Sequence, residues 1–123
     1  MIMDCLSLVG PFAKREGLGM WGEIAAIVGN HPITLMVCFA DHKSEEWSPW
    51  LTFPDEGYAE VAGYGPFRMI EARTVLINSV ERKRVGRLVS EKLIDHSQTV
   101  CDALTAYGII WKEHGLGVFE VTI

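Results

Sequence analysis

Residues 47–78 read WSPWLTFPDEGYAEVAGYGPFRMIEARTVLIN, and this stretch decides the fold class. Prolines and glycines divide its first part into short pieces joined by turns, which is typical of antiparallel strands. Its second part, Phe67–Ile77, begins with clear strand-like alternation. The alternation is lost between residues 71 and 74, which predicts either a bulge near Ala72 or a bend between two strands.

Shorter elements are expected within the first part of this stretch. Trp50–Phe53 is flanked by prolines, so it predicts a brief edge strand or an irregular loop. Tyr58–Val61 alternates like a strand. Gly63–Pro66 (GYGP) predicts a turn rather than a phosphate-binding loop, because its proline lacks an N–H donor and strand-like residues follow it.

One helix and one strand are expected on the N-terminal side. Met20–Val28 has apolar residues at helical spacing, followed by a Gly-Asn-His-Pro sequence that supplies a stop. Ile33–Phe39 is a continuous apolar run, which predicts a central strand buried on both faces. Residues 1–10 have no clear period and are consistent with a short helix or a strand.

The C-terminal side predicts a second helix and a hairpin. Its helix would carry apolar residues on one face, begin at Asp95 or Ser97 and end at Gly108. Residues 109–123 contain a glycine-rich turn and predict a β-hairpin. Between these parts, Ser79–Leu88 is basic and predicts an exposed turn or one helical turn, and Lys92–Ile94 predicts a short strand. The apolar face of the second helix is expected to consist of Val100, Cys101, Leu104 and Tyr107.

This element order predicts a single α+β domain, residues 1–123, in which two helices pack on one face of a mostly antiparallel sheet. A length of 123 residues suits one domain with one core. The chain is 49% hydrophobic and 22% charged, which excludes a disordered protein. Its apolar runs are shorter than the ~20 residues that cross a bilayer. Asp4 stands where a secretion signal carries basic residues, so a cytoplasmic protein without membrane contact is expected.

Metal, cofactor and cysteine chemistry are not expected. The three cysteines are widely spaced without a Cys-x-x-Cys pair, so Cys38 and Cys101 are predicted to be reduced core residues, and Cys5 a reduced thiol. The four histidines show no metal-ligand spacing and are interpreted as surface residues. We therefore predict no catalytic residues and no cofactor, in a protein that is not an enzyme.

Charge is unevenly distributed along the chain, whose formal net charge is −5. Residues 41–60 contain six acids and one lysine, whereas residues 68–92 contain seven basic residues and three acids. The basic run 81–87 lacks the aromatic residues that accompany nucleic-acid binding, so it is interpreted as a solvated face. An acidic segment repels nucleic acid and attracts a basic protein surface.

Aromatic residues lie among these acids, a combination that protein-recognition surfaces favour. The alternative is that the tryptophans cover the edge of the core beneath an irregular loop. We predict that the binding surface for a protein partner contains the following residues: Asp41, Glu45, Glu46, Trp47, Trp50, Asp55, Glu56, Tyr58, Glu60 and Tyr64.

Residues 47–71, WSPWLTFPDEGYAEVAGYGPFRMIE, resemble a group of small uncharacterised bacterial proteins that are similar to immunity proteins of polymorphic-toxin systems. Such immunity proteins are typically small, acidic α+β inhibitors that block the active site of a toxin or an adjacent surface. The resemblance implies a non-enzymatic inhibitor whose partner is a toxin or effector with a basic surface, and it assigns no role to any residue.

Two other functions remain open from the sequence. One is a small enzyme or ligand-binding domain with a pocket lined by Trp50, Tyr58 and Tyr64. The other is a phage- or plasmid-encoded inhibitor of host defence, which would use the same acidic surface. Neither the oligomeric state nor the strand order can be read from the sequence.

Overall fold

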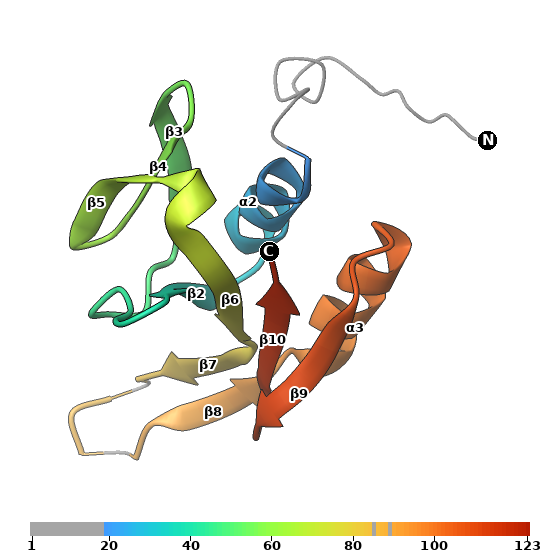
Figure 1. The fold of residues 1–123 in the computed structure, drawn as a ribbon. Helices are drawn as coiled ribbons and strands as arrows, with labels where there is room; N and C mark the ends of the chain where they lie inside the picture. The colour runs from blue at the N-terminus through green and yellow to red at the C-terminus, as the bar shows by residue number, and fades with distance from the viewer. Residues whose placement is uncertain (1–18, 85, 89) are drawn as a thin grey trace.

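The computed structural model describes residues 19–84, 86–88 and 90–123 (Figure 1). Residues 1–10, where a short helix or a strand was expected, lie outside the described residues, and so does the Cys5 thiol. The element bounds, in chain order, are α2 Met20–Asn30, β2 Thr34–Phe39, β3 Leu51–Asp55, β4 Tyr58–Val61, β5 Tyr64–Arg68, the short 3-10 helix η1 Met69–Glu71, β6 Ala72–Asn78, β7 Val80–Lys83, β8 Lys92–Asp95, α3 Ser97–Ala106, β9 Trp111–Gly115 and β10 Val118–Thr122.

The main sheet has four antiparallel strands in the order β2-β6-β10-β9. One of its two inner strands, β6, consists largely of β-branched and apolar residues that suit a pleated, buried surface. Cross-strand neighbours such as Val37 and Val75, or Leu35 and Ile77, point to the same face. Those four side chains are completely buried, so this face forms the floor of the core.

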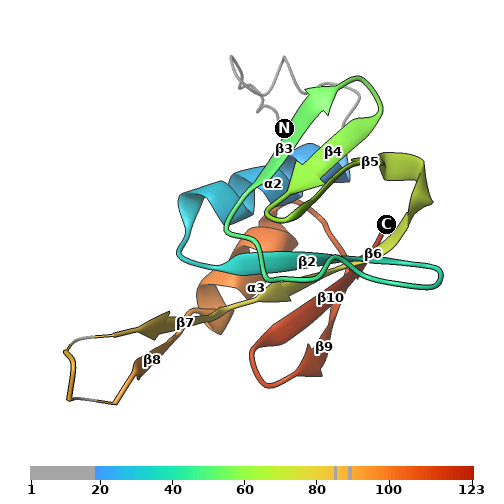
Figure 2. The same ribbon diagram turned by 90° about the vertical axis from the view of Figure 1, so that its left-hand side faces the viewer.

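Both helices cover that face of the sheet (Figure 2). The buried side of α2 includes Ile24 and Val28, and the buried side of α3 consists of Val100 and Leu104. All four belong to one hydrophobic cluster with the inward residues of β2, β6 and β10. The predicted α+β architecture, with two helices on one face of an antiparallel sheet, is therefore confirmed.

Strands β3, β4 and β5 form a separate three-stranded antiparallel sheet, which we call the meander. One face of the meander carries Leu51, Val61 and Phe67, which belong to the same core. The Phe67 ring lies 6.1 Å from the Trp21 ring of α2, measured between centroids. The meander therefore packs its inner face towards α2 and turns its outer face away from the core.

Strands β7 and β8 form a two-stranded antiparallel hairpin that extends from the main sheet (Figures 1 and 2). Its base is held by the buried Ser79, whose backbone N–H and hydroxyl both donate to the Gly117 carbonyl, at 2.8 and 2.7 Å. The His96 N–H donates to the Ser79 carbonyl at 2.8 Å. These bonds join the hairpin to the β9–β10 turn and to the start of α3.

Several local predictions are confirmed. The first helix lies where it was expected and extends two residues further, to Asn30. Tyr58–Val61 is a strand, Gly108 follows the second helix with a φ of 74°, and residues 111–122 form a hairpin. Both alternatives offered for the loss of alternation are found. The 3-10 helix η1 separates a strand of the meander from a strand of the main sheet, and the register between β2 and β6 shifts where Phe39 pairs with Ala72.

Three predictions about strands are wrong. Ile33–Phe39 was expected to be central, but β2 is the first strand of the main sheet. Gly63–Pro66 was expected to be a turn, but β5 begins at Tyr64. Ser79–Leu88 was expected to be a turn or a helical turn, but Val80–Lys83 pairs as a strand with Lys92–Asp95.

The cysteines and the helical face also differ from expectation. Cys38 and Cys101 are free, as predicted, but both are half-buried rather than in the core. On α3 the fully buried residues are Val100 and Leu104, while Tyr107 is exposed. The N-cap of α3 is His96, not Asp95 or Ser97 as predicted, and it makes no side-chain capping bond. Asp95, one residue before it, accepts a hydrogen bond from the Ser97 N–H at 2.9 Å.

A glycine is required at position 117. Gly117 has a φ of 72°, and a Cβ there would lie 2.5 Å from Val80 Cγ2. We predict that Gly117→Ala lowers the free energy of unfolding by about 1–3 kcal/mol, because it adds left-handed strain and a clash with β7. Denaturant unfolding measures the change. Gly115→Ala is the matched control, since no atom lies within 4 Å of its Cβ position. An equal loss of stability in both variants would contradict this interpretation.

Candidate functional site

The segment between β2 and β3, residues 40–50, carries half of the predicted surface residues and lies along the edge of β2. Two bonds of 2.8 Å join the backbones of Leu35 and Ser48 reciprocally. Ser44 N–H donates to the Val37 carbonyl, and Val37 N–H donates back to Ser44 Oγ at 2.9 Å. The segment therefore satisfies the backbone groups that an edge strand would otherwise leave open.

The completely buried Ser48 joins this segment to the meander. Its hydroxyl donates to the Trp50 carbonyl at 2.6 Å and accepts from the Ala62 N–H at 2.9 Å. Glu46 lies close to Gly63, where an added Cβ would come within 2.7 Å of its carboxylate. Segment 40–50 and the β4–β5 turn are thus held together at one end of the meander.

Asp41, His42 and Tyr64 form a hydrogen-bonded chain at that end. His42 Nδ1 lies 2.6 Å from Asp41 Oδ1, and His42 Nε2 lies 2.6 Å from the Tyr64 hydroxyl. A carboxylate can only accept, so Nδ1–H donates to Asp41. The neutral imidazole therefore accepts the Tyr64 O–H at Nε2. The hydrogen bond from His42 holds the pKa of the exposed Asp41 carboxyl below its ordinary value, and the positive charge of the ring adds to this effect when His42 is protonated.

Aromatic packing fixes His42 and Tyr64 in place. The His42 ring stacks on Phe39 at 4.7 Å between centroids, with 12° between the planes. Tyr64 packs against Phe39 at 5.5 Å and against Phe67 at 5.9 Å. Phe67 belongs to the core, so the chain from Asp41 to Tyr64 is anchored to the interior of the protein.

The opposite end of the meander, the β3–β4 turn, carries Asp55, Glu56 and Tyr58. Asp55 Oδ1 accepts a hydrogen bond from the Glu56 N–H at 2.8 Å, and Gly57 adopts a φ of 81°. Tyr58 is exposed and, together with Pro54, Asp55 and Pro66, lines a cavity of about 290 Å³. Two exposed acids and one exposed ring therefore lie together at this tip.

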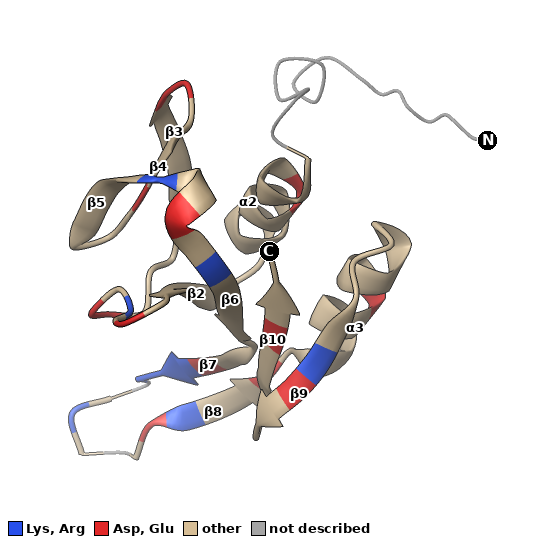
Figure 3. Cartoon of the chain, in the orientation of Figure 1, with Lys and Arg blue, Asp and Glu red and all other residues tan. Residues whose placement is uncertain are grey.

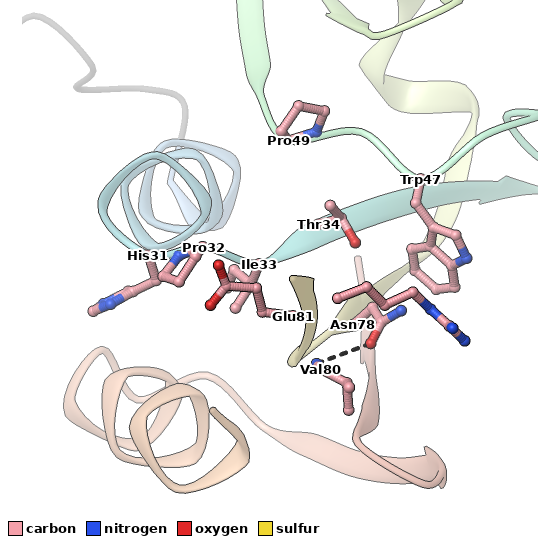
Figure 4. Close-up of a pocket in the computed structure, with 10 residues that line it drawn as sticks. His31, Pro32, Ile33, Thr34, Trp47, Pro49, Asn78, Val80 and Glu81 are labelled. Atoms are coloured by element: carbon pink, nitrogen blue, oxygen red, sulfur yellow. Dashed lines mark hydrogen bonds between the residues drawn. The ribbon is translucent and has the colours of Figure 1, made fainter. Parts of the chain in front are cut away.

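Trp47 lines a different cavity of about 430 Å³, which we call the Trp47 groove (Figure 4). The groove lies between segment 40–50 and β7, and Asn78 and Arg82 line it together with Trp47. Trp50 is not among its lining residues. The groove is formed by His31–Thr34, Trp47, Pro49, Asn78, Val80, Glu81 and Arg82.

The structure separates the predicted surface residues into groups. Glu46 and Tyr64 lie at the β4–β5 end of the meander, where His42 joins Asp41 to Tyr64. Asp55, Glu56 and Tyr58 lie at the β3–β4 tip, and Glu60 lies between the ends, opposite Thr52. Glu45 and Trp50 are exposed. Trp47 faces the groove.

The aromatic rings of the alternative pocket do not converge. Tyr58 is opposite Arg68 on the outer face of the meander, whereas Tyr64 is opposite the buried Val61. The two tyrosines therefore lie at opposite ends and on opposite faces of the meander. This arrangement does not form a single pocket lined by Trp50, Tyr58 and Tyr64.

Two functional features were missed by sequence reasoning. His42 was interpreted as a plain surface residue, although an Asp-His pair directly after a strand was visible in the sequence. The groove residues Asn78 and Arg82 come from segments more than thirty residues beyond Trp47, so no local pattern could connect them.

The other titratable groups show ordinary structural roles. His96 Nε2 pairs with Glu81 Oε1 at 3.0 Å, and His114 Nδ1 pairs with Glu120 Oε1 at 3.1 Å. Burial raises the pKa of the Cys101 thiol, and Asp102 and Glu113 add to the effect, which opposes thiolate chemistry. Within residues 19–84, 86–88 and 90–123, no cluster of histidine, cysteine and acid side chains is arranged to hold a metal ion.

Comparisons with known proteins give no family for this chain: no family model, no curated protein and no solved structure matches it. No helix in the described part of the chain is long and apolar enough to cross a membrane.

We predict that Tyr64→Phe destabilises the protein by about 0.5–1.5 kcal/mol, because it removes the hydroxyl that bonds to His42. Chemical denaturation measures the change. The matched control is Tyr58→Phe, since the Tyr58 hydroxyl has no hydrogen bond to any described residue. Its stability should stay within about 0.5 kcal/mol of the original protein. Equal effects at both tyrosines would show that the bond to His42 contributes nothing.

The lowered pKa of Asp41 predicts a pH-dependent contribution to stability. Because the folded-state pKa lies below the unfolded value of about 3.9, the contribution is complete above that pH and is lost as pH falls through the folded-state pKa. The stability difference between the original protein and Asp41→Asn should therefore be present at about pH 6 and shrink towards about pH 2. Unfolding curves at several pH values test this, and a pH-independent difference would contradict it.

Proposed function

We propose that this protein is a non-enzymatic inhibitor that binds a basic protein partner, in the manner of an immunity protein that neutralises a bacterial toxin or effector. The proposed contact surface consists of segment 40–50, the outer face of the meander and the β3–β4 tip. We call it the acidic–aromatic surface. Inhibition would follow from steric coverage of the partner.

Unpaired acids carry this proposal. In the part of the chain that the structure describes, Glu45, Glu46, Asp55 and Glu56 form no ion pair. Lys83, Arg84, Arg87 and Lys92, which form no salt bridge with any described residue, belong to the hairpin end of the molecule (Figure 3). Lys43 and Arg68, likewise without a salt bridge to a described residue, lie on the acidic–aromatic surface itself, where acids outnumber them. The resulting negative surface would attract a basic partner and accelerate its association.

Partly exposed rings support the same assignment. Trp50 and Tyr58 are 39% and 38% exposed. Each ring is therefore more than half covered by its own protein, which limits the rotamer entropy lost on binding. Large rings with restricted motion are the residues that most often dominate binding energy at protein interfaces.

The size of the surface also fits one partner. The two ends of the meander are separated by strands of four to five residues, which corresponds to roughly 13–17 Å. A standard interface covers about 800 Å² on each partner, so it is wide enough to contact both ends.

The test is co-expression of the full chain with the product of the neighbouring gene in its genome. We expect that product to arrest growth and this chain to restore it. The variant Glu45→Lys/Glu46→Lys/Asp55→Lys/Glu56→Lys should lose protection and associate at least about tenfold more slowly, because steering by the acids is reversed. Growth assays and binding kinetics at two salt concentrations provide the measurement.

The matched control changes charge at the other end of the molecule. Lys83→Glu/Arg84→Glu alters exposed hairpin residues and should leave both protection and association intact. A quadruple acid variant that still folds, by circular dichroism, and binds with the original kinetics would refute the assignment of this surface.

A further inference from the structure

The Trp47 groove has the size of a small-ligand site. Its volume of about 430 Å³ lies within the range of about 300–1,000 Å³ that is typical of ligand clefts. Figure 4 shows Pro49 and Trp47 on either side of Thr34, the first residue of β2, with Ile33 beside Glu81. Indole and proline rings present flat, rigid apolar surfaces, so these walls suit a flat apolar group.

Trp47 is available for such a contact. Its side chain is 36% exposed, and no ring among the described residues stacks on it. Glu46, the adjacent residue, directs its carboxylate towards Gly63 in the β4–β5 turn. The indole therefore faces the groove while its acidic neighbour is held at the meander.

Hydrogen-bond donors predominate among the polar groups of the groove. Glu81 Oε1 lies 3.0 Å from His96 Nε2, and both side chains are mostly covered, so this carboxylate oxygen already has a hydrogen-bond partner within the fold. Arg82 is 69% exposed and has one long contact of 3.4 Å to Glu91. Such an exposed pair contributes little, and the guanidinium can turn to another anion.

Asn78 adds a second donor. Its Oδ1 accepts a hydrogen bond from the Val80 N–H at 3.0 Å, which orients the amide. No described residue accepts a hydrogen bond from the Asn78 amide N–H₂, which is left for a ligand. Together with Arg82 it can bind the two oxygens of one carboxylate.

We propose that the Trp47 groove binds a small molecule with a flat apolar body and one carboxylate. The apolar body stacks on the Trp47 indole and contacts Pro49. The carboxylate pairs with the Arg82 guanidinium and accepts a hydrogen bond from Asn78. This site differs from the acidic–aromatic surface in the charge that it recognises, and its test requires no protein partner.

The test uses indole-3-acetate as the probe and indole-3-acetamide as its neutral isostere. Each is titrated into the full ¹⁵N-labelled chain while the indole N–H of Trp47 and the side-chain N–H groups of Arg82 and Asn78 are followed by NMR. We expect saturable shifts at these groups, and binding of the acid about tenfold tighter than binding of the amide, because only the acid makes a charge-assisted hydrogen bond.

Variants separate the two parts of the site. Arg82→Gln, at an exposed position, should remove the preference for the acid and leave the affinity for the amide unchanged. Trp47→Leu should weaken both probes, whereas Trp50→Leu, a similarly exposed tryptophan that does not line the groove, should weaken neither. Absence of a saturable shift at Trp47, equal affinity for acid and amide, or equal losses in the two tryptophan variants would each overturn the proposal.

Discussion

Two buried serines, Ser44 and Ser48, hold segment 40–50 against the edge of β2, and the rest of the surface depends on this contact. An edge strand leaves a row of N–H and C=O groups without partners, which invites pairing with another chain. Here Ser48 exchanges two backbone bonds with Leu35, and Ser44 supplies both its N–H and its hydroxyl oxygen to Val37. The segment is thereby fixed in register with the main sheet.

That fixed register determines where the meander lies. Ser48 Oγ also bonds to Ala62 in the β4–β5 connection, and the Asp41–His42–Tyr64 chain ties the same region to β5. Residues that protect the sheet edge therefore also orient the acids and rings beside them. A surface supported in this way is pre-organised, so a partner need not pay for ordering a loop when it binds.

The sequence predicts the local elements well because their signals are local. Tyr58–Val61 is recognised by its alternation, and the second helix by its apolar face and the glycine that follows it. Val80–Lys83 could not be recognised, because a polar four-residue strand has no pattern of its own. It becomes a strand only by pairing with Lys92–Asp95. Such pairing depends on residues distant in sequence.

The misplacement of β2 has a related cause. A continuous apolar run is the usual sign of a strand with neighbours on both sides. In this protein Leu35, Met36 and Val37 are all buried, yet one neighbour is an irregular segment rather than a strand. Sequence can predict that a strand is covered, but it cannot distinguish a covering loop from a covering strand.

Only part of the candidate surface could be predicted from the sequence, namely its acidic residues. Unpaired acids around Glu45 and Glu56 could be recognised from composition, whereas the groove required segments that only the fold brings together. The fold contains cations that could have neutralised these acids, among them Lys83 and Arg84, but it carries them on the hairpin. Exposed ion pairs contribute at most about 1 kcal/mol, so the fold loses little by keeping these charges apart. Separating charges of opposite sign therefore changes stability only slightly, whereas it strongly affects which partner can bind. For this reason we propose that the acidic part of the molecule recognises the partner.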